Sequence, residues 1–251
     1  MTRLFIKSIF YVVVFLVSSA ASVWADISYT SNGQVVTQDF NSLGTAGASW
    51  TDDSTIAGWF SNRTTYLAGN GSGTAGGLYS YGATGNSERA IGSLASNSVD
   101  PVQIGIRLTN LSGKTLTKLT VTYDGEQWRA ANNGSAHSLT FAYAIGSSLT
   151  LASPGTAVSQ LNFTSPILTN AGALDGNAAA NRVAGITFAI NNITWLPGQQ
   201  LVLRWTDVND SGNDHGLAVD NFNFIAVPEP TTFGLGSLLG LAVLAMQRRR
   251  K

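Results

Sequence analysis

The segment VQIGIRLT, residues 102–109, decides the fold class of this chain. Its apolar side chains, Val102, Ile104, Ile106 and Leu108, alternate with polar or small residues. Successive side chains of a β-strand point to opposite faces of the sheet, so this alternation predicts a strand with one buried face. The same alternation recurs in residues 119–123, 139–145 and 186–190.

Shorter runs rich in β-branched and aromatic residues predict six further strands, with Gly- and Asn-rich turns between many of them. They are residues 35–40, 64–67, 78–81, 160–164, 201–205 and 217–225. The Gly/Ser/Thr-rich stretch 68–86 is interpreted as a loop or hairpin inside one domain, and only 171–184 could hold a helical turn. About ten short strands without a long amphipathic helix predict an all-β fold, an antiparallel two-sheet sandwich of jelly-roll type.

The composition between residues 26 and 226 restricts the class of partner. This region has eight basic and 13 acidic residues, a net charge of −5, and the whole chain has no cysteine. A surface with so few scattered basic residues argues against a nucleic-acid partner. Because no disulfide can form, the sandwich has to be held together by its hydrophobic core, for which about 200 residues suffice.

The first 25 residues have the features of a signal peptide. Two basic residues precede an apolar run at 9–17, and small residues follow up to Ala25, with Val23 and Ala25 suited to a signal-peptidase site. The sequence therefore predicts cleavage after Ala25 and a mature chain that starts at Asp26. A retained N-terminal membrane helix is the alternative.

The last 25 residues, 227–251, have three parts in a fixed order. Pro228, Glu229 and Pro230 come first, followed by an uncharged stretch over 231–247. As a helix, 17 residues would be roughly 25 Å long, slightly short of a ~30 Å hydrocarbon core, and could span a membrane that thins locally. A terminal basic cluster would stay in the cytoplasm and place the rest of the chain outside. That cluster consists of Arg248, Arg249, Arg250 and Lys251.

This arrangement resembles the PEP-CTERM sorting signal of Gram-negative bacteria that make extracellular polysaccharide. The resemblance implies an exported protein that its tail holds transiently in the inner membrane, with the preceding domain in the periplasm. It also implies processing near Pro-Glu-Pro by a membrane protease of the exosortase type and a final location at the cell surface or in the extracellular matrix. An ordinary single-pass anchor is the alternative.

Four segments of the central region resemble a bacterial secreted β-sandwich module of unassigned activity: residues 41–60, 87–96, 123–129 and 203–224. The resemblance implies a fold and a location but no catalytic residues. The closing segment GLAVDNFNF, residues 216–224, also looks like the last strand of jelly-roll adhesion and carbohydrate-binding domains, which carries an acidic pair. Here the second position of that pair is Asn221.

The loop before that strand is the candidate metal site. Oxygen ligands close together around a glycine are what Ca²⁺ coordination needs, although no final glutamate of the EF-hand type is present. The alternative is a loop in which Asp and Asn side chains bond their own backbone. The predicted calcium ligands are Asp207, Asn209, Asp210, Asp214 and Asp220.

The segment YDGEQWR, residues 123–129, is the second candidate site. Asp124 and Glu126 could serve as the two carboxylates of glycoside hydrolysis. Alternatively, Glu126 is buried and paired with Arg129 or Arg89. Aromatic platforms hold sugars in sandwich lectins, and Trp59 and Trp128 are the candidates for exposed platforms, with Arg129 beside them. His137 and His215, 78 positions apart, have no partner at metal-ligand spacing and are interpreted as polar loop or strand residues.

The sequence thus predicts an exported, exosortase-processed surface or matrix protein with a non-catalytic structural or binding role at exopolysaccharide. A Ca²⁺-dependent, lectin-like carbohydrate-binding module is the competing hypothesis, and a weak glycoside hydrolase is the third. Apart from Ca²⁺, no cofactor is expected.

Overall fold

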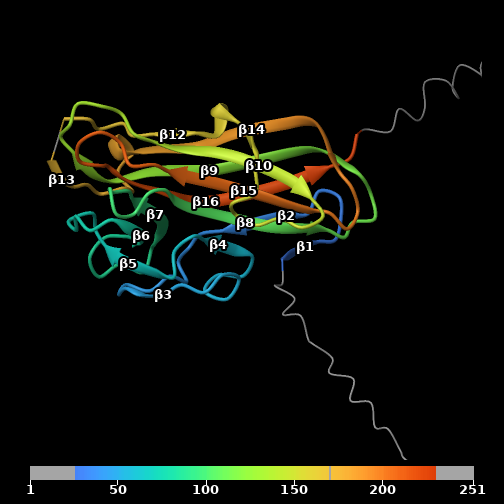
Figure 1. Cartoon of the computed structure of the whole chain (residues 1–251), viewed down its shortest axis with the longest axis horizontal. Helices are drawn as coiled ribbons and strands as arrows, with labels where there is room; N and C mark the ends of the chain where they lie inside the picture. The colour runs from blue at the N-terminus through green and yellow to red at the C-terminus, as the bar shows by residue number, and fades with distance from the viewer. Residues whose placement is uncertain (1–25, 170, 230–251) are drawn as a thin grey trace, which may run out of the picture.

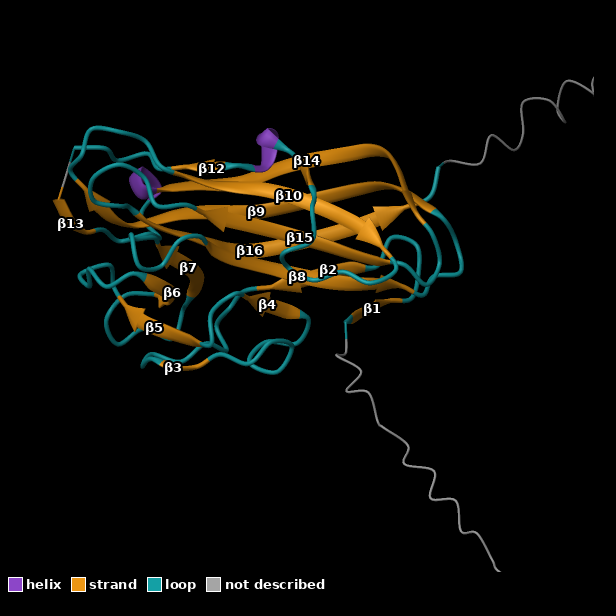
Figure 2. Ribbon diagram, viewed as in Figure 1, coloured by secondary structure: helices purple, strands orange, loops and turns teal. Residues whose placement is uncertain are grey.

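The computed structural model describes residues 26–169 and 171–229, which form two packed β-sheets (Figures 1 and 2). The predicted signal peptide, residues 1–25, and the predicted membrane segment, 231–247, lie outside the described residues. Among the described residues, no helix has the length and apolar character needed to cross a membrane. Both sheets and the whole described core lie between Asp26 and Val227, so this stretch has the contacts of an independently folding domain.

The first sheet has seven strands: β1 (Ile27–Tyr29), β4 (Trp59–Ser61), β8 (Val102–Asn110), β10 (Ser138–Gly146), β11 (Thr156–Ala157), β12 (Phe163–Thr164) and β15 (Gln200–Asp207). Their order is β1-β8-β15-β10-β11, with β4 also paired to β8 and β12 to β10. All of these pairs are antiparallel except β1 with β8, which is parallel.

The second sheet has nine strands: β2 (Val35–Gln38), β3 (Ala48–Ser49), β5 (Thr65–Gly69), β6 (Gly77–Tyr81), β7 (Ala90–Leu94), β9 (Leu116–Ala131), β13 (Ala171–Ala173), β14 (Arg182–Trp195) and β16 (Gly216–Val227). Their order is β13-β9-β16-β7-β6-β5-β3, with β14 also paired to β9 and β2 to β16. The long strands run side by side along the molecule, and the short strands β3 to β6 lie below them in Figure 1.

An aromatic cluster fills the space between the sheets. Trp205 of β15 lies at its centre, with the ring centroids of Trp59, Tyr123, Phe141 and Phe222 between 5.1 and 6.1 Å away. All five residues are at most 1% exposed. Burial of large aromatic side chains supplies much of the stabilisation that a sandwich without disulfides needs.

The structure confirms an all-β two-sheet sandwich and most of the predicted strands. Residues 160–164 are the exception, because a 3₁₀ turn (Ser159–Leu161) precedes the two-residue strand β12. The stretch 68–86 is not a hairpin, since β5 and β6 pair in parallel. A second 3₁₀ turn (Ala179–Asn181) occurs within 171–184, as expected.

Candidate functional site

The five predicted calcium ligands lie in three different places. Asp207 is buried, Asn209 donates a side-chain hydrogen bond to Asn97, and Asp220 lies on β16 facing a separate acidic cluster. Asp210 and Asp214, in the loop between β15 and β16, are the two whose carboxylates share one group of potential ligand atoms. The prediction of one calcium site with these five ligands is therefore wrong, because the strand β16 carries Asp220 away from the loop.

The two loop carboxylates meet a histidine that the sequence does not place with them. The Nδ1 atom of His137 lies 3.3 Å from Asp214 Oδ1 and 3.5 Å from Asp210 Oδ2. His137 is 2% exposed, and burial lowers the pKa of its imidazole while it raises the pKa of Asp214 to about 6. The backbone N–H of His215 also points at His137 Nδ1, at 3.2 Å, so this ring nitrogen already has a donor.

The second histidine holds this end of the sandwich together. The ring centroids of His137 and His215 are 4.4 Å apart. His215 Nδ1 accepts hydrogen bonds from the Gln127 side chain and the Ala131 backbone, and Nε2 lies 3.1 Å from the Ser135 carbonyl oxygen. Acceptor contacts at Nδ1 and a carbonyl at Nε2 fit the neutral tautomer protonated at Nε2. The two histidines are thus a buried structural pair, which the 78-residue separation conceals.

The segment 123–129 does not form a hydrolase site. Glu126 is fully buried, and its Oε2 accepts a hydrogen bond from the Trp128 indole N–H at 2.8 Å. A carboxylate without solvent access cannot protonate a glycosidic oxygen, so the hydrolase hypothesis for this pair of residues is not supported. Burial of Glu126 was expected, but its partner is Trp128 and neither of the two arginines named as alternatives.

Neither candidate tryptophan is an exposed platform. Trp59 is 1% exposed inside the main core, and Trp128 is fully buried in a second cluster on the other side of the nine-stranded sheet. Trp128 stacks on Tyr81, with 6.0 Å between ring centroids. The loop at Gly176 covers it so closely that a Cβ there would lie 2.3 Å from the indole nitrogen. The prediction that these two tryptophans contact a ligand from the surface is therefore wrong.

Arg129 lies at a small polar cavity of about 280 Å³. Its guanidinium donates to the carbonyl oxygens of Gly71 and Ser72, and the cavity wall also includes Asn209 and Asp214. Two candidates that are far apart in the sequence, Arg129 and the loop before β16, therefore border one cavity.

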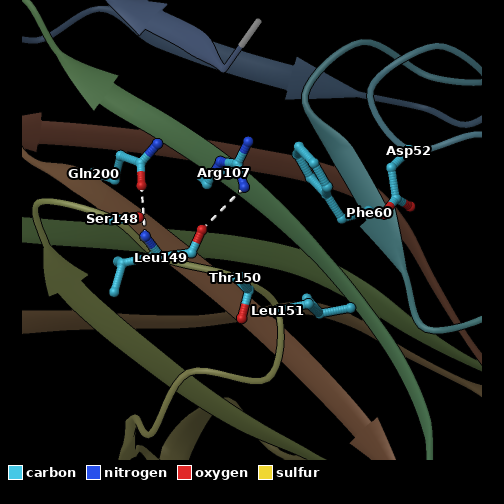
Figure 3. Close-up of a pocket in the computed structure, with 8 residues that line it drawn as sticks. All are labelled: Asp52, Phe60, Arg107, Ser148, Leu149, Thr150, Leu151 and Gln200. Carbon is cyan, nitrogen blue, oxygen red and sulfur yellow. Dashed lines mark hydrogen bonds between the residues drawn. The ribbon is translucent and has the colours of Figure 1, made fainter. Parts of the chain in front are cut away.

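A larger cavity of about 480 Å³ lies on the outer side of the seven-stranded sheet (Figure 3). The loop 147–155 folds over this face, and Arg107 donates to the Leu149 carbonyl while Gln200 accepts from the Leu149 N–H. The Arg107 guanidinium lies 4.3 Å from the centre of the Phe60 ring and pairs with Asp26. An aromatic ring and hydrogen-bonding groups thus lie side by side.

The end of the fold coincides with the start of a recognised motif. The last strand, β16, ends at Val227, and residues 226–251 match the family model described as the PEP-CTERM protein-sorting motif. The chain carries a PEP-CTERM signal. Such a signal implies export, transient anchoring in a membrane and processing by an exosortase, as the tail sequence predicts. Pro228 and Glu229 of the PEP-CTERM triplet are described and follow the strand directly, whereas Pro230 lies outside the described residues.

Comparison with curated proteins gives no match for this PEP-CTERM chain. Similar solved structures include a xylan-binding domain from Paenibacillus barcinonensis, 11% identical over 80% of this chain and 99% of that one, with a TM-score of 0.36. A family 11 carbohydrate-binding module from Clostridium thermocellum is 13% identical over 75% and 100% of the two chains, with a TM-score of 0.33. Likeness at this level assigns no ligand and no activity to the PEP-CTERM protein.

Proposed function

We propose that residues 26–226 are the exported cargo of the PEP-CTERM signal and have a non-catalytic binding role at the exopolysaccharide of the cell surface or extracellular matrix. The observation that carries the proposal is the position of the motif, which begins where the last strand of the sandwich ends. Processing near Pro228 would therefore release a complete domain and cut no strand. The producing cell would be a Gram-negative bacterium, with the domain passing through the periplasm after loss of the signal peptide.

The cavity in Figure 3 is the best candidate for the glycan contact. Its volume of about 480 Å³ lies in the range of small-molecule sites, and a sugar ring combines an apolar face with hydroxyl groups. The half-buried side chains of Leu149 and Leu151 can contact the apolar face, whereas Phe60 is 7% exposed and lies under the Arg107 guanidinium. Among the described residues, Arg107 uses two of its five N–H donors, on Asp26 and the Leu149 carbonyl, which leaves others for hydroxyl oxygens.

The test is binding of purified residues 26–226 to the exopolysaccharide of the producing organism. Ser148 is exposed at the cavity, so Ser148→Trp should block the cavity without disturbing the core and reduce affinity at least tenfold. The matched control is Val183→Trp, at a side chain that is 44% exposed on the other sheet, which should bind like the unmodified protein.

A third variant distinguishes glycan binding at the larger cavity from glycan binding at the smaller one. Asn213 is exposed and borders the smaller cavity with Arg129. Loss of binding in Asn213→Trp with full binding in Ser148→Trp would contradict the assignment of the glycan to the larger cavity. Absence of binding by the unmodified protein would contradict the binding role itself.

A Ca²⁺-dependent, lectin-like module is the second candidate function. The acidic group formed by Asp210 and Asp214 beside His137, of which Asp214 borders the smaller cavity, is the observation that favours it. In that case chelation should abolish glycan binding, and Asp210→Asn should weaken it. Binding that is equal with and without chelator would contradict a calcium-dependent contact.

A further inference from the structure

Three carboxyl groups from different parts of the chain lie together on the face of the nine-stranded sheet that points away from the main core. Glu126 lies on β9, Asp220 on the neighbouring strand β16, and Glu88 precedes β7, which pairs with β16 on its other side. One potential ligand oxygen from each lies within 4.8 Å of the other two. Glu126 is fully buried and Asp220 is 3% exposed, so solvent does not separate these groups.

The two oxygens of each carboxyl group have different surroundings. One oxygen of each accepts a hydrogen bond from a side-chain N–H: Glu126 from Trp128 at 2.8 Å, Glu88 from Asn177 at 2.5 Å and Asp220 from Asn221 at 3.1 Å. The other oxygen of each is buried without a hydrogen-bond partner among the described residues. This is the pattern of metal ligands whose orientation is fixed by surrounding hydrogen bonds.

No described arginine or lysine forms an ion pair with the group, although Arg182 lies opposite Glu126 on the neighbouring strand. Arg182 lies 3.8 Å from Asp124, and the buried guanidinium of Arg89 donates to Ser80. None of the ion pairs formed by residues 26–169 and 171–229 includes Glu88, Glu126 or Asp220. Two buried carboxyl groups and a half-buried one, none of them in an ion pair, repel one another when ionised, so the cluster needs either protons or a cation.

We propose that Glu88, Glu126 and Asp220 bind one Ca²⁺ ion that ties β9 and β16 to the segment before β7. All the donors are carboxylate oxygens, which hard cations prefer. The oxygens lie within 4.8 Å of one another, which is close enough for all three to reach one Ca²⁺ at 2.3–2.6 Å.

This site is distinct from the predicted loop and independent of what the glycan cavity binds. Of the predicted calcium ligands it uses only Asp220, and it adds Glu126 and Glu88, which sequence spacing does not connect. Burial raises the pKa of Glu126 to about 7 and that of Asp220 to about 8, so without a cation the pair is partly protonated at neutral pH. Calcium binding should therefore release protons.

Terbium luminescence offers a direct test, because Tb³⁺ occupies Ca²⁺ sites and is sensitised by a nearby tryptophan. Trp128 is hydrogen-bonded to Glu126, so excitation of tryptophan in chelator-stripped residues 26–226 should give sensitised Tb³⁺ emission that Ca²⁺ displaces. Added Ca²⁺ should also raise the melting temperature, since a ligand that binds only the folded state stabilises it.

The variants Glu126→Gln and Asp220→Asn should each weaken Ca²⁺ binding at least tenfold. Both should melt in chelator at or above the temperature of the unmodified protein, because each replaces a buried carboxyl group by an amide of the same shape that cannot ionise. Asp210→Asn, in the other acidic group, is the matched control and should retain binding.

Two results would overturn the proposal. One is an unmodified protein with neither sensitised Tb³⁺ emission nor a Ca²⁺-dependent melting temperature at millimolar Ca²⁺, which would mean that the cluster holds only protons. The other is loss of binding in Asp210→Asn with retention in Glu126→Gln, which would place the cation in the loop between β15 and β16.

Discussion

The indole N–H of Trp128 donates a hydrogen bond of 2.8 Å to Oε2 of Glu126, and both side chains are fully buried. The two residues are two positions apart on β9, so they lie on the same side of the sheet. The bond therefore links the aromatic stack on that side to the carboxyl cluster. It explains why a tryptophan and a glutamate stand together in YDGEQWR without invoking a surface platform or a catalytic pair.

Trp128→Phe should destabilise the domain through the loss of this bond as well as through lost packing. A buried acceptor without its donor costs about 1–3 kcal/mol, and packing loss adds to that. In a double-mutant cycle with Glu126→Met, which removes the acceptor, the two residues should show a coupling energy of about 1–2 kcal/mol in urea unfolding measured in chelator. Effects that add without coupling would contradict a stabilising bond.

Gly125→Ala should destabilise the domain because the position between Asp124 and Glu126 has no room for a side chain. A Cβ at Gly125 would lie 2.3 Å from the ring of Phe163, which is 1% exposed in the core. Overpacking of this kind costs about 1–3 kcal/mol. Gly69→Ala is the control, since its Cβ would meet nothing closer than 4.0 Å; equal melting temperatures for both variants would contradict the prediction.

Asp207→Asn should change the pH dependence of stability. Burial raises the pKa of Asp207 to about 7, so the folded state binds its proton more tightly than the unfolded chain, where the ordinary value is 3.8. The contribution of Asp207 to stability is therefore greatest below pH 4 and falls as the pH rises to about 7.

Relative to Asp207→Asn, the unmodified domain should lose stability between these two pH values, by at most about 4 kcal/mol at about 1.4 kcal/mol per pKa unit. Urea unfolding of both proteins at several pH values measures this difference. A difference in stability that does not vary with pH would show that the buried carboxyl group titrates normally.

Tyr29→Phe should loosen the end of the last strand, next to the sorting motif. The Tyr29 hydroxyl donates to the Ala226 carbonyl at 2.8 Å and accepts from the Ala226 N–H at 2.7 Å. Its loss should cost about 1–3 kcal/mol and speed hydrogen exchange at Ala226. Tyr81→Phe, which removes one contact of 3.4 Å, should cost less; similar costs would argue against a special role of Tyr29.

Alternation of apolar residues predicts the long strands, because a strand with one buried face has an apolar side chain at every second position. In β8, Val102, Ile104, Ile106 and Leu108 are at most 1% exposed, as the period of two requires. The strand β7 is not predicted, because all five of its residues are buried and the alternation disappears where loops cover the second face. Loops on this second face also bury Trp128, which the sequence predicts to be an exposed platform.

The site residues are less predictable because strand order decides which of them meet. Glu88 and Asp220 come together since β7 and β9 both flank β16, an arrangement that no local spacing encodes. His137 and His215 meet for a similar reason at the end of the sheet. The sorting motif can be predicted from the sequence, because its three parts follow one another along the chain and their recognition does not depend on the fold.

The most direct test of the proposed role is the fate of the full chain in the producing cell. We expect mass spectrometry to find a protein that starts at Asp26 and ends near Pro228, in a fraction that is released when the exopolysaccharide is degraded. A chain with Glu229→Ala should remain in the membrane fraction because the sorting triplet is broken. Recovery of the unmodified chain with its tail intact in the inner membrane, unaffected by degradation of the polysaccharide, would contradict the account.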